Sequence, residues 1–182
     1  SGFTGAPEDA VFSAITVGAK GGVRDYTSIG HSAGTATLNL EDGSTANFHD
    51  QTIVGERGGS NGTIYVKGGS TLNLGAVTVL GKEAGAKGEI YIEGDEDDYS
   101  ALTADELIIG DKGTGTVEVT ATANDDWKDT YTISAKEITL GESAGGRGTL
   151  SIGEAATVGK ITNLRVGREG IGTLTTEADI ET

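Results

Sequence analysis

Acidic side chains gather in two short stretches of this chain, and they are the residues best suited to chemistry. The stretches are 94–100 and 124–129, and together they hold seven acids, the only Trp and one Tyr that we expect to be exposed. Carboxylates bind cations and sugar hydroxyls, and aromatic rings offer a stacking surface. The candidate binding residues are therefore Asp95, Glu96, Asp97, Asp98, Tyr99, Asp125, Asp126, Trp127 and Asp129.

Three interpretations of these stretches compete. They are solvated acidic loops, or a recognition patch for a glycan or protein in which Trp127 and Tyr99 stack on the ligand, or a calcium site. Calcium takes roughly six to eight oxygen ligands, and the aspartates supply some of them. The run lacks the spacing of an EF-hand with its terminal Glu, so we expect no metal and no other cofactor.

Catalysis has little support in the sequence. A glycosidase needs two carboxylates about 5–10 Å apart in a groove, and nothing marks such a pair here. The only base among the acids is Lys128. His31 and His49 lie in different parts of the sequence, with no Ser or acid at the spacing of a catalytic triad, and we interpret them as surface residues. We therefore expect that the chain is not an enzyme.

A repeated phrase positions both acidic stretches. It consists of an aliphatic residue, Gly, a short polar turn and Gly-Thr-aliphatic, and its clearest copy spans 53–74. A period of this length is typical of a solenoid. The acidic stretches fall in the two long intervals, so we expect two insertions that emerge side by side. The leading glycines, at intervals of 25, 26, 29, 31 and 26 residues, are Gly30, Gly55, Gly81, Gly110, Gly141 and Gly167.

The repeat predicts an all-β fold. Aliphatic residues alternate with polar ones around the glycines, as in strands with one face inward. Three short strands per roughly 25-residue coil, joined by glycine turns, indicate a right-handed parallel β-helix. We expect a single segment over 1–182, in which 14–182 form the stacked repeats and 1–13 an irregular lead-in.

Stacking makes equivalent side chains neighbours on adjacent coils. Position one after the leading glycine alternates in charge over Glu56, Lys82 and Asp111, which predicts a ladder of ion pairs, each contributing roughly 0–1 kcal/mol when exposed. Tyr65 and Tyr91 occupy the same outward position, which predicts a stacked pair.

A second candidate site is the outward position two residues before the leading glycine. It holds three β-branched aliphatics in consecutive coils, Ile53, Val79 and Ile108. They reflect either plain β-propensity or an exposed strip through which two rods associate side by side.

Composition narrows the classes of partner. A net charge of -15 disfavours a nucleic-acid partner, because phosphate binding needs basic groups. The chain has no Cys, no Met and no long apolar run. We therefore expect no disulfides and no membrane anchor within it, and we interpret it as a fragment of a longer protein.

The pattern aliphatic-Gly, Gly-Thr-aliphatic, Gly-Gly and Leu over 53–74, repeated in part over 79–92 and 139–152, resembles the repeat of AIDA-like autotransporter passenger domains of type V secretion, which is shared with some PEP-CTERM-associated surface proteins. The resemblance covers about residues 14–182. It implies a secreted right-handed β-helix on a Gram-negative cell surface, held at the outer membrane only through a translocator barrel that this chain lacks.

The resemblance also implies a function. Many AIDA-like passengers act as adhesins or as self-associating factors in aggregation and biofilm formation, so the expected partner is a protein or glycan of a host or sister cell. Two alternatives stay open: a passive β-helical stalk, and a β-helix that binds or degrades polysaccharide.

Overall fold

The computed structural model describes residues 14–17, 26–94, 99–120, 132–154 and 156–178. This part of the chain consists of strands and turns without a helix. The strands are β1 (Ala14–Val17), β2 (Tyr26–Ile29), β3 (Gly34–Leu40), β4 (Thr45–Phe48), β5 (Gln51–Val54), β6 (Ser60–Val66), β7 (Thr71–Leu80), β8 (Lys87–Glu93), β9 (Ala101–Ile109), β10 (Thr114–Thr120), β11 (Ile133–Leu140), β12 (Arg147–Ile152), β13 (Asn163–Val166) and β14 (Ile171–Thr176).

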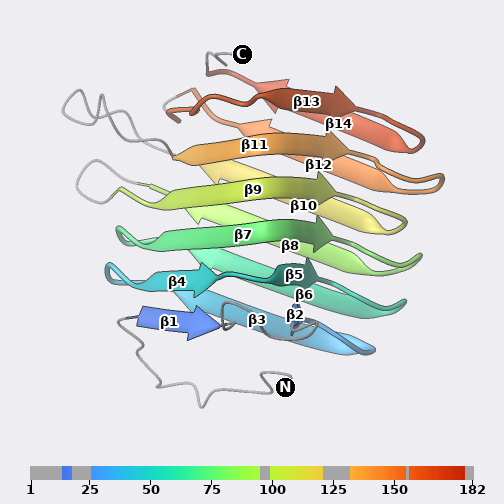
Figure 1. Cartoon of the computed structure of the whole chain (residues 1–182), viewed down its shortest axis with the longest axis horizontal. Coiled ribbons are helices and arrows are strands. Elements are labelled where there is room, and N and C mark those ends of the chain that lie inside the picture. The colour runs from blue at the N-terminus through green and yellow to red at the C-terminus, as the bar shows by residue number, and fades with distance from the viewer. Residues whose placement is uncertain (1–13, 18–25, 95–98, 121–131, 155, 179–182) are drawn as a thin grey trace.

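All ladders between these strands are parallel, and they form two sheets. One sheet has the order β14-β12-β10-β8-β6-β3, and the other runs β1-β4-β7-β9-β11-β13, with β2 and β5 alongside. Successive coils cross one sheet, return along the other and rise by one strand, which winds the chain right-handedly (Figure 1). The predicted right-handed parallel β-helix is confirmed.

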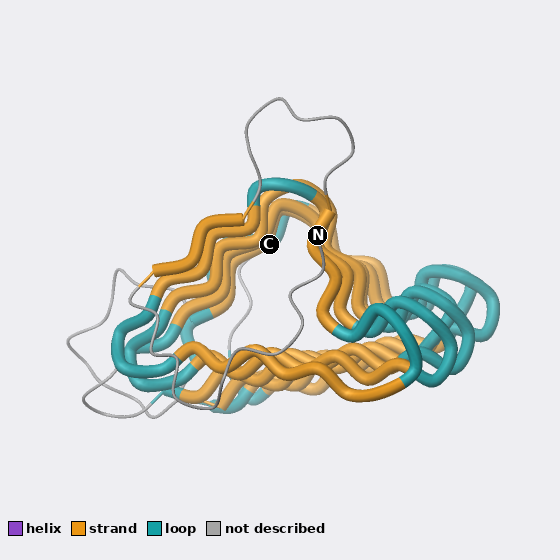
Figure 2. The backbone as a smooth tube through the Cα atoms, turned by 90° about the horizontal axis from the view of Figure 1, so that it is seen from below, coloured by secondary structure: helices purple, strands orange, loops and turns teal. Residues whose placement is uncertain are grey.

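The connection between coils differs from the three separate short strands that we predicted. β4 and β5 are separate, but in the next coil the corresponding strands merge into the single strand β7, which pairs with both of them. β7 turns the corner through a register irregularity between Leu74 and Val77, with Ala76 at φ 50°. The ladder therefore continues around a corner of the coil (Figure 2).

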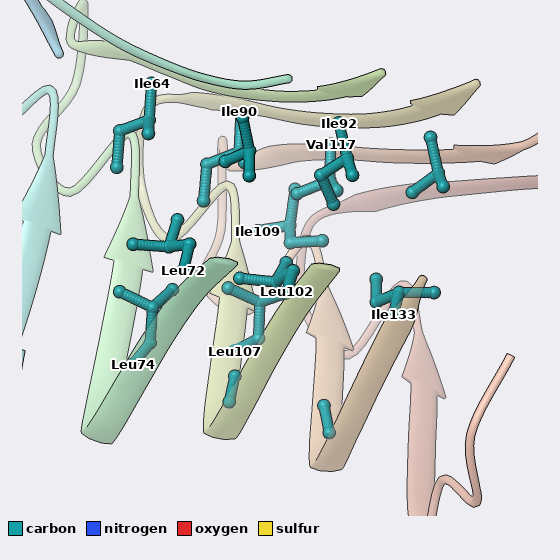
Figure 3. Close-up of a cluster of buried hydrophobic side chains, with 14 of the residues drawn as sticks. Ile64, Leu72, Leu74, Ile90, Ile92, Leu102, Leu107, Ile109, Val117 and Ile133 are labelled. Atoms are coloured by element: carbon teal, nitrogen blue, oxygen red, sulfur yellow. The ribbon is translucent and has the colours of Figure 1, made fainter. Parts of the chain in front are cut away.

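Aliphatic columns fill the interior. Along β8 the side chains alternate between buried and accessible, and Ile90 and Ile92 are fully buried. The register partners of Ile90 on the two adjacent coils, Val117 and Ile64, are buried as well. Figure 3 shows these side chains packed between the walls together with Leu72 and Leu102 from the other sheet. Because burial of such side chains drives folding, each coil is stabilised by contact with its neighbours.

The two glycines of the repeated phrase serve different purposes. Gly55 has φ 71° and turns the chain out of β5, a conformation that other residues rarely adopt. Gly62 allows close approach instead, since a Cβ there would lie 2.0 Å from the carbonyl oxygen of Ile29 on the preceding coil. In β3 the register partner of Gly62 is Ala36, and β3 is the edge of its sheet, so no described strand approaches it from the other side.

Candidate functional site

Most of the predicted binding residues lie outside the described part of the chain. These are Asp95, Glu96, Asp97, Asp98, Asp125, Asp126, Trp127 and Asp129. Tyr99 is the exception, and Asn124 and Lys128 also lie outside.

The described ends of the two insertions lie next to each other. β8 ends at Glu93, which is in register with Thr120 at the end of β10. The amide of Gly94 donates to the carbonyl oxygen of Thr120 over 2.8 Å. On the return side, the amide of Leu102 donates to the carbonyl oxygen of Thr132 over 2.9 Å. The insertions therefore leave and rejoin the solenoid at matching positions on adjacent coils.

Tyr99 is less exposed than the sequence suggested. Its ring is half-buried and its hydroxyl oxygen is buried. Burial raises the pKa of Tyr99 to about 12, against a hydrogen bond with Thr132 that lowers it. The residue helps to fix the end of the first insertion to the next coil.

The aliphatic strip is stacked as predicted but is not exposed. Ile53, Val79 and Ile108 are in register, yet Ile53 and Val79 are only 1% and 6% exposed and Ile108 is half-buried. The expectation of an exposed strip is therefore wrong. After the leading glycine the chain folds back over this face, as the contact of Glu56 with Ser28 in the same column shows. Side chains covered in this way cannot form a contact strip between rods.

A polar cluster on this same face was missed by sequence reasoning. Its centre is Glu56, which is 5% exposed and is the one charged residue among the buried residues of the described chain. The hydroxyl of Ser28 donates to Oε2 over 2.9 Å, and Nδ1 of His31 lies 2.6 Å from the same oxygen. The hydroxyl of Tyr26 donates to Oε1 over 3.4 Å, and Nζ of Lys82 lies 3.4 Å from it.

The cluster keeps Glu56 ionised. Burial alone raises the pKa of its carboxyl, but the hydrogen bonds of His31 and Ser28 and the charge of Lys82 outweigh burial, so the pKa lies below the ordinary value of 4.5. A buried carboxylate with several donors is the expected arrangement for a charge removed from water.

The geometry of this cluster is not that of a nucleophilic triad. In a triad the serine hydroxyl contacts the imidazole, and the acid contacts the other ring nitrogen. Here Ser28 and His31 both contact Oε2 of Glu56. The arrangement serves to hold a carboxylate between coils.

The register of the repeat could have revealed this cluster. His31 and Glu56 both follow a leading glycine, and Ser28 stands in the column of Ile53. Position one after the glycine therefore brings an acid beside His31. His31 is partly exposed, as we expected of a surface residue, but our search for an acid near it used spacing along the chain and not spacing along the stack, so it missed Glu56.

Other predicted ladders are partly confirmed. Glu56 and Lys82 form the predicted ion pair, whereas Asp111 accepts a hydrogen bond from the hydroxyl of Ser143 over 2.5 Å. Tyr65 and Tyr91 stack with ring centroids 5.2 Å apart. Because each ring packs one face against the other ring, that face is not available for a ligand.

Comparisons with protein-family models, curated proteins and solved structures found no match. Within the described ranges, no group of three or more His, Asp or Glu side chains is placed to hold a metal ion. The described residues also include no helix that is long and apolar enough to cross a bilayer.

Proposed function

We propose that this chain is an adhesive segment of an AIDA-like autotransporter passenger, exposed at a bacterial cell surface. Its partner is a protein or glycan of a host or sister cell, and the contact is made by the insertions 94–100 and 124–129. The observation that carries the proposal is the pairing of their ends, Gly94 with Thr120 and Leu102 with Thr132.

This pairing matters because loops on a rigid scaffold are the usual place for recognition. Because the ends of the two insertions lie on adjacent coils, one partner can contact both. The sequence supplies the insertions with seven acids and Trp127, a combination suited to sugar hydroxyls or to basic protein groups.

A binding screen tests the proposal. The whole chain is presented to glycan and matrix-protein arrays and to bacterial cells. Two variants accompany it: Trp127→Ala, and a graft in which 94–100 is replaced by Gly-Gly-Ser, the sequence at the same corner of an earlier coil (68–70). We expect both variants to lose binding.

The matched control is Tyr65→Ala, which removes an aromatic ring from β6 of the six-stranded sheet and leaves the sequence of both insertions unchanged. We expect this variant to keep full binding. Binding that survives both the Trp127 substitution and the graft excludes the insertions as the contact.

A passive stalk is the second candidate. It is favoured by side-chain bonds that link adjacent coils on the outer surface, such as Asn73 to Asn47 over 2.8 Å and Arg165 to Glu137 over 3.2 Å. These contacts stiffen the rod and need no ligand. A folded chain that binds no cell, glycan or matrix protein supports the stalk.

A further inference from the structure

One carboxylate joins three successive coils of the solenoid. Tyr26 and Ser28 belong to β2, and His31 to the turn that follows it. Glu56 follows β5, and Lys82 follows β7 on the coil after that. All four partners converge on the two oxygens of Glu56, at distances between 2.6 and 3.4 Å.

The backbone holds β2 on one side only. β2 pairs with β5 through four residues, from Tyr26 opposite Gln51 to Ile29 opposite Val54, and it has no other partner strand in the described structure. By contrast, β7 pairs with strands on both sides. The contacts of Tyr26, Ser28 and His31 with Glu56 therefore add to this single ladder and to the buried Ile29 in fixing β2.

A solenoid can open locally at such a place. Each coil contacts only its neighbours, so loss of one set of contacts need not spread along the stack. Segments with few buried contacts open with a smaller free energy than the whole protein. β2 fits this description, since Tyr26 is 42% exposed and β2 has a described partner strand on one side only.

We propose that Glu56 is an acid-sensitive clamp, which holds β2 and its turn on the solenoid when ionised and releases them when protonated, while the coils from β8 onward stay folded.

The chemistry of the carboxylate gives the reason. The ionised group accepts hydrogen bonds at both oxygens and attracts a cationic Lys82. A protonated group must donate from one oxygen, which the ammonium of Lys82 cannot accept, and it no longer attracts that cation. The titratable groups that face Glu56 are Tyr26 and His31 from β2 and its turn, and Lys82 from the turn after β7.

The direction of the pH effect follows from the lowered pKa of the Glu56 carboxyl in the folded protein. Because its pKa in the folded protein is below 4.5, its contribution is complete above the pKa of the unfolded chain. That contribution is lost as the pH falls through the lower, folded value. Release of β2 is therefore expected in acid, below about pH 4.5.

Glu56→Gln tests the clamp at neutral pH, because the amide has the shape of the protonated acid without the charge. Hydrogen exchange followed by mass spectrometry is measured for peptides along the whole chain. We expect amides of 26–31 to exchange roughly 10- to 100-fold faster, the loss anticipated for hydrogen bonds to a charged group. Peptides covering β8, β10 and β12 should keep the wild-type rate.

The control is Glu142→Gln, which changes the same position of a later coil, where Glu142 is bonded to Arg168. It should leave 26–31 unchanged. Wild-type protection of 26–31 in Glu56→Gln overturns the clamp, and so does faster exchange along the entire chain.

A second measurement uses the wild-type protein in acid. The amides of Gly55 and Glu56 donate to the carbonyl oxygens of Ile29 and Gly30, so their NMR signals report whether β2 is attached. We expect them to shift with a midpoint below pH 4.5 in the wild type and to show no such transition in Glu56→Gln. The same transition in both proteins overturns the assignment to Glu56.

Discussion

The phenol rings of Tyr65 and Tyr91 lie nearly parallel on adjacent coils, with centroids 5.2 Å apart and an angle of 15° between their planes. A double-mutant cycle with Tyr65→Ala and Tyr91→Ala should give a coupling of about 0.5–1.5 kcal/mol in the free energy of unfolding. Tyr65 and Ser151, which share the column but lie on distant coils, should give none. Equal coupling for both pairs contradicts a direct stacking contribution.

Tyr91 should make the protein sensitive to alkali. Burial, with a hydrogen bond from its hydroxyl to Glu89, raises the pKa of Tyr91 from 10.0 to about 12. The folded state therefore holds the proton more tightly than the unfolded chain, so stability is complete below pH 10 and falls as the pH rises toward 12. Chemical denaturation across this range measures the loss, and Tyr91→Phe should reduce it and leave the part that comes from Tyr99. A profile unchanged by this substitution assigns the loss to another group.

Gly88→Ala should destabilise the fold strongly. A Cβ at Gly88 would lie 2.0 Å from the carbonyl oxygen of Val54, and the backbone must move to relieve the clash. We expect a loss of about 2 kcal/mol or more in the free energy of unfolding. Gly153→Ala is the control, because its Cβ would meet the carbonyl oxygen of Val119 at 3.3 Å and should cost much less. Similar losses for both variants would refute close approach as the reason for Gly88.

Thr78→Val should stabilise the protein. The Thr78 hydroxyl is fully buried and has no hydrogen-bond partner in the described structure, and the register partner on the next coil is already the aliphatic Leu107. Removing an unpaired buried hydroxyl should raise the free energy of unfolding by about 1 kcal/mol. Thr132→Val should have the opposite effect, because the hydroxyl of Thr132 accepts the amide hydrogen of Thr157. Thermal unfolding of both variants checks the signs, and a lower melting temperature for Thr78→Val is the contrary result.

The stacking of the solenoid was predictable because it is periodic. Gly55 and Gly81 mark the same position in adjacent coils, and from this alone the pairing of Glu56 with Lys82 and of Tyr65 with Tyr91 follows. The aliphatic residues of β8 show their inward face through simple alternation. Each of these features involves only a residue and the residue at the equivalent position of the next coil.

Features that depend on the path of a turn were not predictable in the same way. The burial of Ile53 and Val79 arises where the chain after a leading glycine folds back over the sheet, and the sequence pattern records only that a turn exists. The Glu56 cluster requires the same knowledge, together with residues from three coils. The merging of two strands into β7 depends on Ala76 at a positive φ. An alanine in the sequence gives no sign of that conformation. The structure describes only the ends of the two insertions. The proposed contact therefore stays a prediction.

The unbroken register between β6 and β8 has a consequence for how such a protein can change over time. The stretch 56–81 is one full circuit that begins and ends at equivalent points. Copying or excising it whole would alter the height of the rod by about 4.8 Å and leave its cross-section the same. The length of the rod is therefore set by the number of coils. Duplication of a coil can change that number and leave the packing of the interior as it is.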